Sequence, residues 1–188
     1  VDSSPTLSSD GTVVYVGSYD DNLYAVHASN GTQFWSFPTG GYVYSSPTLS
    51  SDGTVVYVGS DTGNLYAVHA GNGTKFWSFP AGNYVDSSPT LSSDGTVVYV
   101  GSGDDNLYAV HAGNGTQFWS FPTGSYVQSS PTLSSDGTVV YVGSGDDNLY
   151  AVHAGNGTQF WSFPTGSYVQ SSPTLSSDGT VVYVGSGD

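Results

Sequence analysis

Hydrophobic residues occur along the whole chain in short runs that are separated by turn-forming residues. In the first 42 residues, VVYV at 13–16 and LYAV at 23–26 lie between the turn sequences Asp10-Gly11, Asp20-Asp21-Asn22 and Asn30-Gly31. Runs of this length, rich in Val, Tyr and Phe, are typical of strands and not of helices. Because Asp-Gly and Asn-Gly favour tight hairpin turns, the pattern predicts an antiparallel meander. Its four strands are expected near 5–8, 12–17, 23–28 and 32–38.

The two central runs are apolar at consecutive positions and do not alternate with polar residues. A strand with one solvated face would show that alternation, so both faces of this small sheet must be covered.

The pattern repeats with a period of 42 residues. The stretch SSPTLSSDGTVVYVGS begins at Ser3, Ser45, Ser87, Ser129 and Ser171, without an insertion or deletion. Such a period indicates a solenoid, a propeller or another repeat array. A four-stranded sheet that is covered on both faces and repeated at this interval predicts an all-β propeller. We expect one array, with blades at 1–42, 43–84, 85–126 and 127–168 and a half blade at 169–188.

Two better-known repeat architectures fit less well. A short-period β-helix repeats far more often than every 42 residues, and WD40 blades carry a Trp-Asp dipeptide, whereas every Trp here precedes Ser.

Composition excludes several classes of partner. The chain contains one Lys, no Arg and a formal net charge of -14, so it lacks the clustered basic residues that bind nucleic acid or anionic membranes. Without Cys it has neither a disulfide framework nor a thiolate metal site. It begins at Val1, contains no signal-peptide-like or membrane-spanning run, and is expected to be a processed or partial chain.

The stretch VHAGNGTQFWSFPTG, identical at 110–124 and 152–166, carries a family resemblance. The repeat resembles that of pyrroloquinoline-quinone-type β-propellers, whose blades have the motif A-x-D-x-x-T-G-x-x-x-W. In the first unit this motif falls on Ala25, His27, Asn30, Gly31 and Trp35, with His in place of the usual Asp and Asn in place of Thr. The resemblance implies an eight-bladed wheel in which each Trp docks on the turn of a neighbouring blade. The docking residues would be Trp35, Trp77, Trp119, Trp161, Gly31, Gly73, Gly115 and Gly157.

Several repeated residues have a chemical and a structural interpretation. One Trp per blade could stack on a ligand, but a fixed register favours packing. The four His residues, His27, His69, His111 and His153, recur on separate blades, too far apart to share one zinc ion. The turns at Asp20, Asp104 and Asp146 are oxygen-rich enough for calcium, yet no further acidic residue follows at a spacing that would complete the coordination shell. We therefore predict no metal site.

Each repeat also contains the sequon Asn-Gly-Thr. It is the acceptor pattern for N-glycosylation on exposed loops, and it is equally a sequence that a tight turn before a strand would use. Both interpretations stay open for Asn30, Asn72, Asn114 and Asn156.

No catalytic constellation emerges from the sequence. There is no G-x-S-x-G elbow, and neither paired carboxylates nor a nucleophile with a base stands out. Quinone-dependent relatives hold their cofactor with acidic calcium ligands, a basic residue and often cysteines, whereas this chain has no Glu, Arg or Cys. We predict no enzyme, no catalytic residues and no cofactor.

Three functions remain from different classes. The leading one is a non-catalytic scaffold or interaction and self-assembly module, extracellular or at the cell surface. The alternatives are a fragment of a quinoprotein dehydrogenase and a glycan- or peptide-binding propeller that uses exposed tyrosines.

Differences among the repeats indicate where a partner would bind. They gather in the turn between the second and third strands and in the connection between blades, two segments that open on the same face of a propeller. The predicted interaction face comprises Tyr19, Asp20, Tyr44, Asp61, Asn83 and Asp86.

The chain closes with half of a repeat unit. Residues 169–188 form a hairpin without a third and fourth strand, and an unpaired apolar hairpin invites another chain. It is nearly identical to the first hairpin, so the two would compete for the strands at 23–28 and 32–38. We expect either a longer array or copies that join end to end through this hairpin.

Overall fold

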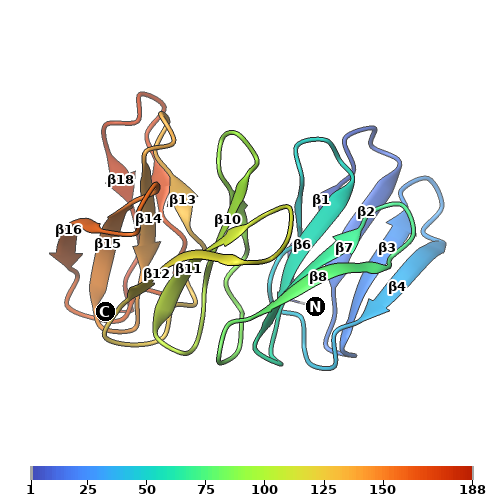
Figure 1. Ribbon diagram of the computed structural model, residues 1–188, viewed down its shortest axis with the longest axis horizontal. Helices are drawn as coiled ribbons and strands as arrows, with labels where there is room; N and C mark the ends of the chain where they lie inside the picture. Colours follow the sequence, from blue (N-terminus) through green and yellow to red (C-terminus); the bar gives the residue numbers. More distant parts are fainter. Residues whose placement is uncertain (1, 188) are drawn as a thin grey trace.

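The computed structural model describes residues 2–187, which form strands and turns only. Four four-stranded antiparallel sheets follow one another along the chain and stand next to each other in chain order, as Figure 1 shows. We call them sheets A to D. They confirm the predicted all-β, four-stranded architecture. Their strands are β1 (Thr6–Leu7), β2 (Val13–Gly17), β3 (Asn22–His27), β4 (Gln33–Pro38), β5 (Thr48–Leu49), β6 (Val55–Ser60), β7 (Asn64–His69), β8 (Lys75–Pro80), β9 (Thr90–Leu91), β10 (Val97–Gly101), β11 (Asn106–His111), β12 (Gln117–Pro122), β13 (Thr132–Leu133), β14 (Val139–Gly143), β15 (Asn148–His153) and β16 (Gln159–Pro164).

The first strand of each sheet is shorter than the sequence predicts. In sheet A it comprises only Thr6 and Leu7, which pair with Tyr15 and Val14. Pro5 has no N–H to donate and so cannot extend the ladder. The remaining strands agree with the predicted ranges to within a residue at either end.

A bulge interrupts the pairing of the third and fourth strands. Ala25 pairs with Trp35, but Val26 pairs with Gln33, so Phe34 is an extra residue on β4. The Phe34 side chain is exposed and lies beside His27, with 5.1 Å between the ring centroids. The same bulge recurs in the other three sheets.

The core lies between consecutive sheets. One cluster joins Tyr15, Leu23 and Trp35 of sheet A to Val56 and Val68 of sheet B, and two equivalent clusters join B to C and C to D. Every residue of β6 is buried, as the run of consecutive apolar positions predicts. The array is therefore held together by sheet-to-sheet packing, with each inner sheet contributing to two clusters.

The short first strands connect neighbouring sheets along one seam. The Thr6 hydroxyl donates to the Pro47 carbonyl oxygen at 2.5 Å, and the Ser4 N–H donates to the Ser46 hydroxyl at 2.9 Å. Equivalent Thr-to-Pro bonds link each later pair of sheets. These bonds link the sheets in addition to the contacts of the apolar core.

After sheet D the chain forms a two-stranded sheet, β17 (Thr174–Leu175) and β18 (Val182–Tyr183). Its first strand continues the seam, because Thr132 donates to the Pro173 carbonyl oxygen at 2.6 Å. Within residues 2–187 no helix is long and apolar enough to cross a membrane.

Candidate functional site

The connection between two sheets bridges the turns of both. The Val43 N–H donates to the Ser18 carbonyl oxygen in sheet A at 3.1 Å, and the Asp61 N–H in sheet B donates to the Tyr42 carbonyl oxygen at 2.9 Å. Val43 also packs so closely on Gly17 that a Cβ at this glycine would have no room. The two variable segments of the repeat therefore meet on one edge of the array, which we call the loop face.

Three tyrosines form a cluster on the loop face. The ring centroids of Tyr19 and Tyr44 are 5.1 Å apart, those of Tyr19 and Tyr42 are 5.5 Å apart, and those of Tyr42 and Tyr44 are 6.0 Å apart, all edge-on. Edge-on packing of this kind holds aromatic rings in place. Tyr19 and Tyr42 are 41% and 46% exposed, so the cluster presents aromatic surface to solvent.

Carboxylates surround this tyrosine cluster. The Tyr19 hydroxyl hydrogen-bonds to the Asp2 carboxylate, which raises the pKa of Tyr19 to about 12. Partial burial and the nearby Asp61 and Asp86 raise the pKa of Tyr44. The Tyr19 and Tyr44 phenols therefore stay protonated at neutral pH.

The other predicted face residues lie around the cluster or at the next connection. Asp20 accepts a hydrogen bond from the Tyr24 hydroxyl at 2.7 Å, and the Asn83 side chain donates to the Gly103 carbonyl oxygen at 3.2 Å. Asp86 accepts from the Gln128 side chain at 3.0 Å, but its Oδ1 is buried without a hydrogen-bond partner among the described residues. Burial raises the pKa of this carboxyl group.

Sequence comparison among the repeats missed Tyr42. The same residue type occurs one, two and three periods later, at Tyr84, Tyr126 and Tyr168, so this position does not vary within the array. The sequence feature that could have identified Tyr42 is the residue type itself, because a connection between two sheets can be built from Gly and polar residues and needs no tyrosine.

The repeated tryptophans lie at the sheet junctions. The Trp35 indole N–H donates to the Ala70 carbonyl oxygen at 2.8 Å, and Trp77 and Trp119 make the same bond to the next sheet at 2.9 Å. The Trp35 ring also covers Gly73, where a Cβ would lie 2.8 Å from ring atoms. The docking role itself stays a prediction, for which the variants in the Discussion provide a test.

The remaining repeated polar residues have local partners. Asn30 Oδ1 accepts from the backbone N–H and the hydroxyl of Thr32, at 3.0 and 2.8 Å, and the other three sequons repeat this turn on the surface. Each His lies against a Phe of its own sheet. Within residues 2–187, no three His, Asp or Glu side chains gather as metal ligands would.

A solved structure confirms the fold. The crystal structure of BamB from Moraxella catarrhalis superimposes with a TM-score of 0.82 at 18% sequence identity, over 98% of this chain. The match covers 55% of the BamB chain, so this chain spans about half the length of that relative. No curated protein sequence matches the chain.

A family model described as outer membrane protein assembly factor BamB matches residues 1–120 and 61–188, which together cover the whole chain. This match agrees with the quinoprotein-type repeat that the motif around each Trp indicates. The chain belongs to the PQQ-like β-propeller repeat family that this BamB model defines.

Proposed function

We propose that the chain is a non-catalytic protein-interaction scaffold whose loop face binds partner proteins. The observation that carries this proposal is the cluster of Tyr19, Tyr42 and Tyr44, held edge-on and partly exposed. Tyrosine is enriched among the residues that dominate binding energy at protein interfaces, because it offers a large contact area for little lost side-chain entropy. The description of the matching family as an assembly factor supports the same class of function.

The aromatic rings and carboxylates of the loop face indicate which kind of partner segment would bind there. Asp2, Asp61 and Asp86 are close to the tyrosine rings, and the chain carries 15 acidic residues against one basic one. A lysine or arginine side chain could therefore contact both a ring face and a carboxylate. The partner segment is expected to be basic and to associate faster at low ionic strength.

The finer parts of the proposal concern location and self-association. The family description names the outer membrane, which supports a cell-envelope location, and we place the chain at the cell surface or outside the cell. We also propose that the chain can self-associate through the terminal half blade, residues 169–188, because its apolar hairpin has no third and fourth strand.

Site-specific photo-crosslinking tests the proposed face. A photoreactive phenylalanine analogue at position 42 should capture a protein partner in the organism's own envelope fraction, and Tyr19→Ala should weaken that capture. The matched control carries the same analogue at Ser51, in a turn on the opposite edge of the array. Capture at Ser51 with none at position 42 would overturn the proposal, whereas Tyr42-dependent binding on a glycan array would favour the glycan-binding alternative.

A further inference from the structure

The turn between the third and fourth strands of each sheet contains Asn followed by Gly, the dipeptide in which Asn loses ammonia most readily. The Gly nitrogen attacks the side-chain carbonyl carbon, Cγ, because a residue without a side chain hinders the approach least. A bond forms between this nitrogen and Cγ, the bond from Cγ to the side-chain nitrogen breaks, and ammonia leaves with the proton that the Gly nitrogen loses. Water then opens the resulting cyclic imide at either carbonyl group, which gives Asp or isoaspartate.

Hydrogen bonds hold this turn closed in sheet B. The Gly73 N–H donates to the His69 carbonyl oxygen at 2.9 Å. Oδ1 of Asn72 accepts from the backbone N–H and the hydroxyl of Thr74, at 3.0 and 2.8 Å, so the Asn side chain is held toward Thr74. The same three bonds recur in sheets C and D. The Gly nitrogen can attack only when its N–H is released and the Asn side chain has turned, so the closed turn is unreactive.

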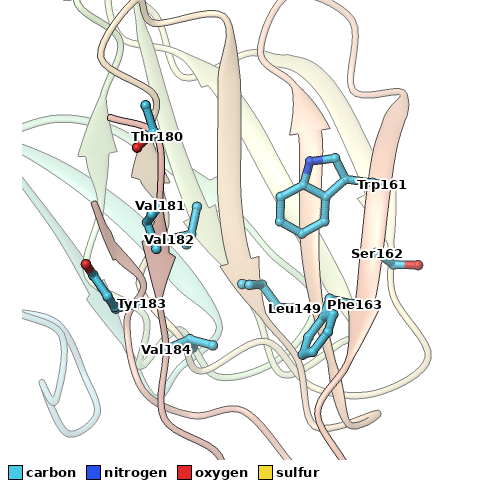
Figure 2. Close-up of a pocket in the computed structure, with 9 residues that line it drawn as sticks. All are labelled: Leu149, Trp161, Ser162, Phe163, Thr180, Val181, Val182, Tyr183 and Val184. Atoms are coloured by element: carbon cyan, nitrogen blue, oxygen red, sulfur yellow. The ribbon is translucent and has the colours of Figure 1, made fainter. Parts of the chain in front are cut away.

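The tryptophan of the preceding sheet lies over the same turn. In sheet B a Cβ added at Gly73 would lie 2.8 Å from atoms of the Trp35 ring, and the Trp35 N–H donates to the Ala70 carbonyl oxygen at 2.8 Å. The tryptophans of sheets B and C make the equivalent contacts with the turns of the next sheets. Trp161 lies instead beside the terminal hairpin, as Figure 2 shows. At the three junctions between four-stranded sheets, the turn therefore opens only when the junction loosens.

We propose that Asn72, Asn114 and Asn156 are sites of spontaneous deamidation, and that loosening of the junction with the preceding sheet sets the rate at each of them. All three residues are exposed, so water reaches them. Because the closed turn is unreactive, the rate follows the fraction of time for which the turn is open. Each product adds a negative charge, and isoaspartate adds one atom to the backbone of the turn, so the glycine no longer fits beneath the Trp ring. Deamidation thus makes a transient opening permanent.

Peptide mass spectrometry after incubation in heavy-oxygen water tests the proposal, because the oxygen label marks deamidation that occurs before digestion. Chymotrypsin cleaves after Tyr and Phe and releases residues 67–76, which contain Asn72 and carry their own label in Lys75. Residues 109–118 and 151–160 are identical and are measured together as one pooled peptide. In the folded chain, both peptides should react about tenfold or more slowly than in the chain unfolded by urea.

Two matched variants separate the junctions. Trp35→Ala should raise the deamidation rate at Asn72 by about tenfold or more and leave the pooled peptide unchanged. Trp77→Ala should do the reverse, because it uncovers Gly115 and leaves Trp35 over Gly73. Each variant therefore carries its own control in the same molecule.

The ratio of the two peptides distinguishes local loosening from general unfolding, which would raise both rates alike. If Trp35→Ala unfolds the whole array, Trp35→Phe takes its place, because it keeps a ring over the turn and loses only the N–H. It should raise the rate at Asn72 alone, by about fivefold. A folded parent chain that deamidates as fast as the unfolded one would overturn the proposal. Rates at Asn72 that do not respond to the folded variants, or that rise equally in the pooled peptide, would also overturn it.

Discussion

At the scale of single residues, a repeated Trp is expected to contribute more to stability at a junction between two four-stranded sheets than beside the terminal hairpin. Trp119→Ala removes a buried indole and its hydrogen bond to Ala154, and should lower the free energy of unfolding by about 3–5 kcal/mol. Trp161→Ala should cost less than half as much, because its ring borders an open groove. Denaturant unfolding of both variants makes the comparison. Equal losses, or a loss below about 1 kcal/mol for Trp119, would contradict the docking role.

Asp86 is expected to lower the stability of the fold at neutral pH. Its carboxylate is partly buried with one unpaired oxygen, whereas Gln128 and Gln170 occupy the same register position and hydrogen-bond to each other at 2.7 Å. Asp86→Gln should extend that ladder and raise stability at pH 7 by about 1 kcal/mol, a modest value because the carboxyl group is part exposed. Since the pKa of Asp86 is raised in the folded state, its ionisation destabilises the fold as pH rises above the unfolded value of 3.8. The gain should therefore disappear in thermal melts at pH 3, and a gain that persists there would contradict this explanation.

At the scale of elements, the turn between the third and fourth strands combines a backbone and a packing requirement. Gly73 and Gly31 share φ 70°, so alanine at either position costs about 1–2 kcal/mol for the left-handed conformation. Gly73 also lies under the Trp35 ring, so Gly73→Ala should cost about 1–3 kcal/mol more from overpacking. Thermal melts of the two variants under dilute conditions measure the difference. Similar losses would show that the Trp ring moves aside without cost.

The elements themselves were largely predictable from the sequence. The runs VVYV and LYAV and the period of 42 are sufficient for four-stranded sheets covered on both faces, and β2 to β4 lie within a residue of their expected bounds. The bulge at Phe34 was not predicted, because a one-residue slip in pairing leaves no mark in an apolar run. The tyrosine cluster depended on two connections meeting in space, so only its variable members, Tyr19 and Tyr44, could be found from the repeats.

At the scale of the whole molecule, the net charge and the turn carboxylates affect the stability of the fold in opposite directions as pH falls. The net charge of -14 produces mutual repulsion, which weakens as pH falls from 7 toward the isoelectric point of about 4.1. Five turn carboxylates oppose that trend at lower pH: Asp10, Asp52, Asp94, Asp136 and Asp178. Hydrogen bonds from a Ser and a Thr hydroxyl and a backbone N–H lower the pKa of each, that of Asp178 to about 2.

A lowered folded-state pKa means that the turn carboxylates stabilise the fold above the unfolded value of 3.8 and lose that effect as pH falls toward 2. We therefore expect the melting temperature to rise from pH 7 to about 4 and to fall below it. Replacing all five residues by Asn should keep the turns, because Asn30 already accepts the same two bonds from Thr32. The Asn variant should show a smaller acid-side fall between pH 3.8 and 2, since its amides do not titrate, while Asp20 and Asp146, whose pKa values are also lowered, remain. Thermal melts of the parent chain and the Asn variant between pH 4 and 2 measure this difference. An equal fall in melting temperature for both proteins would show that other carboxylates cause acid unfolding.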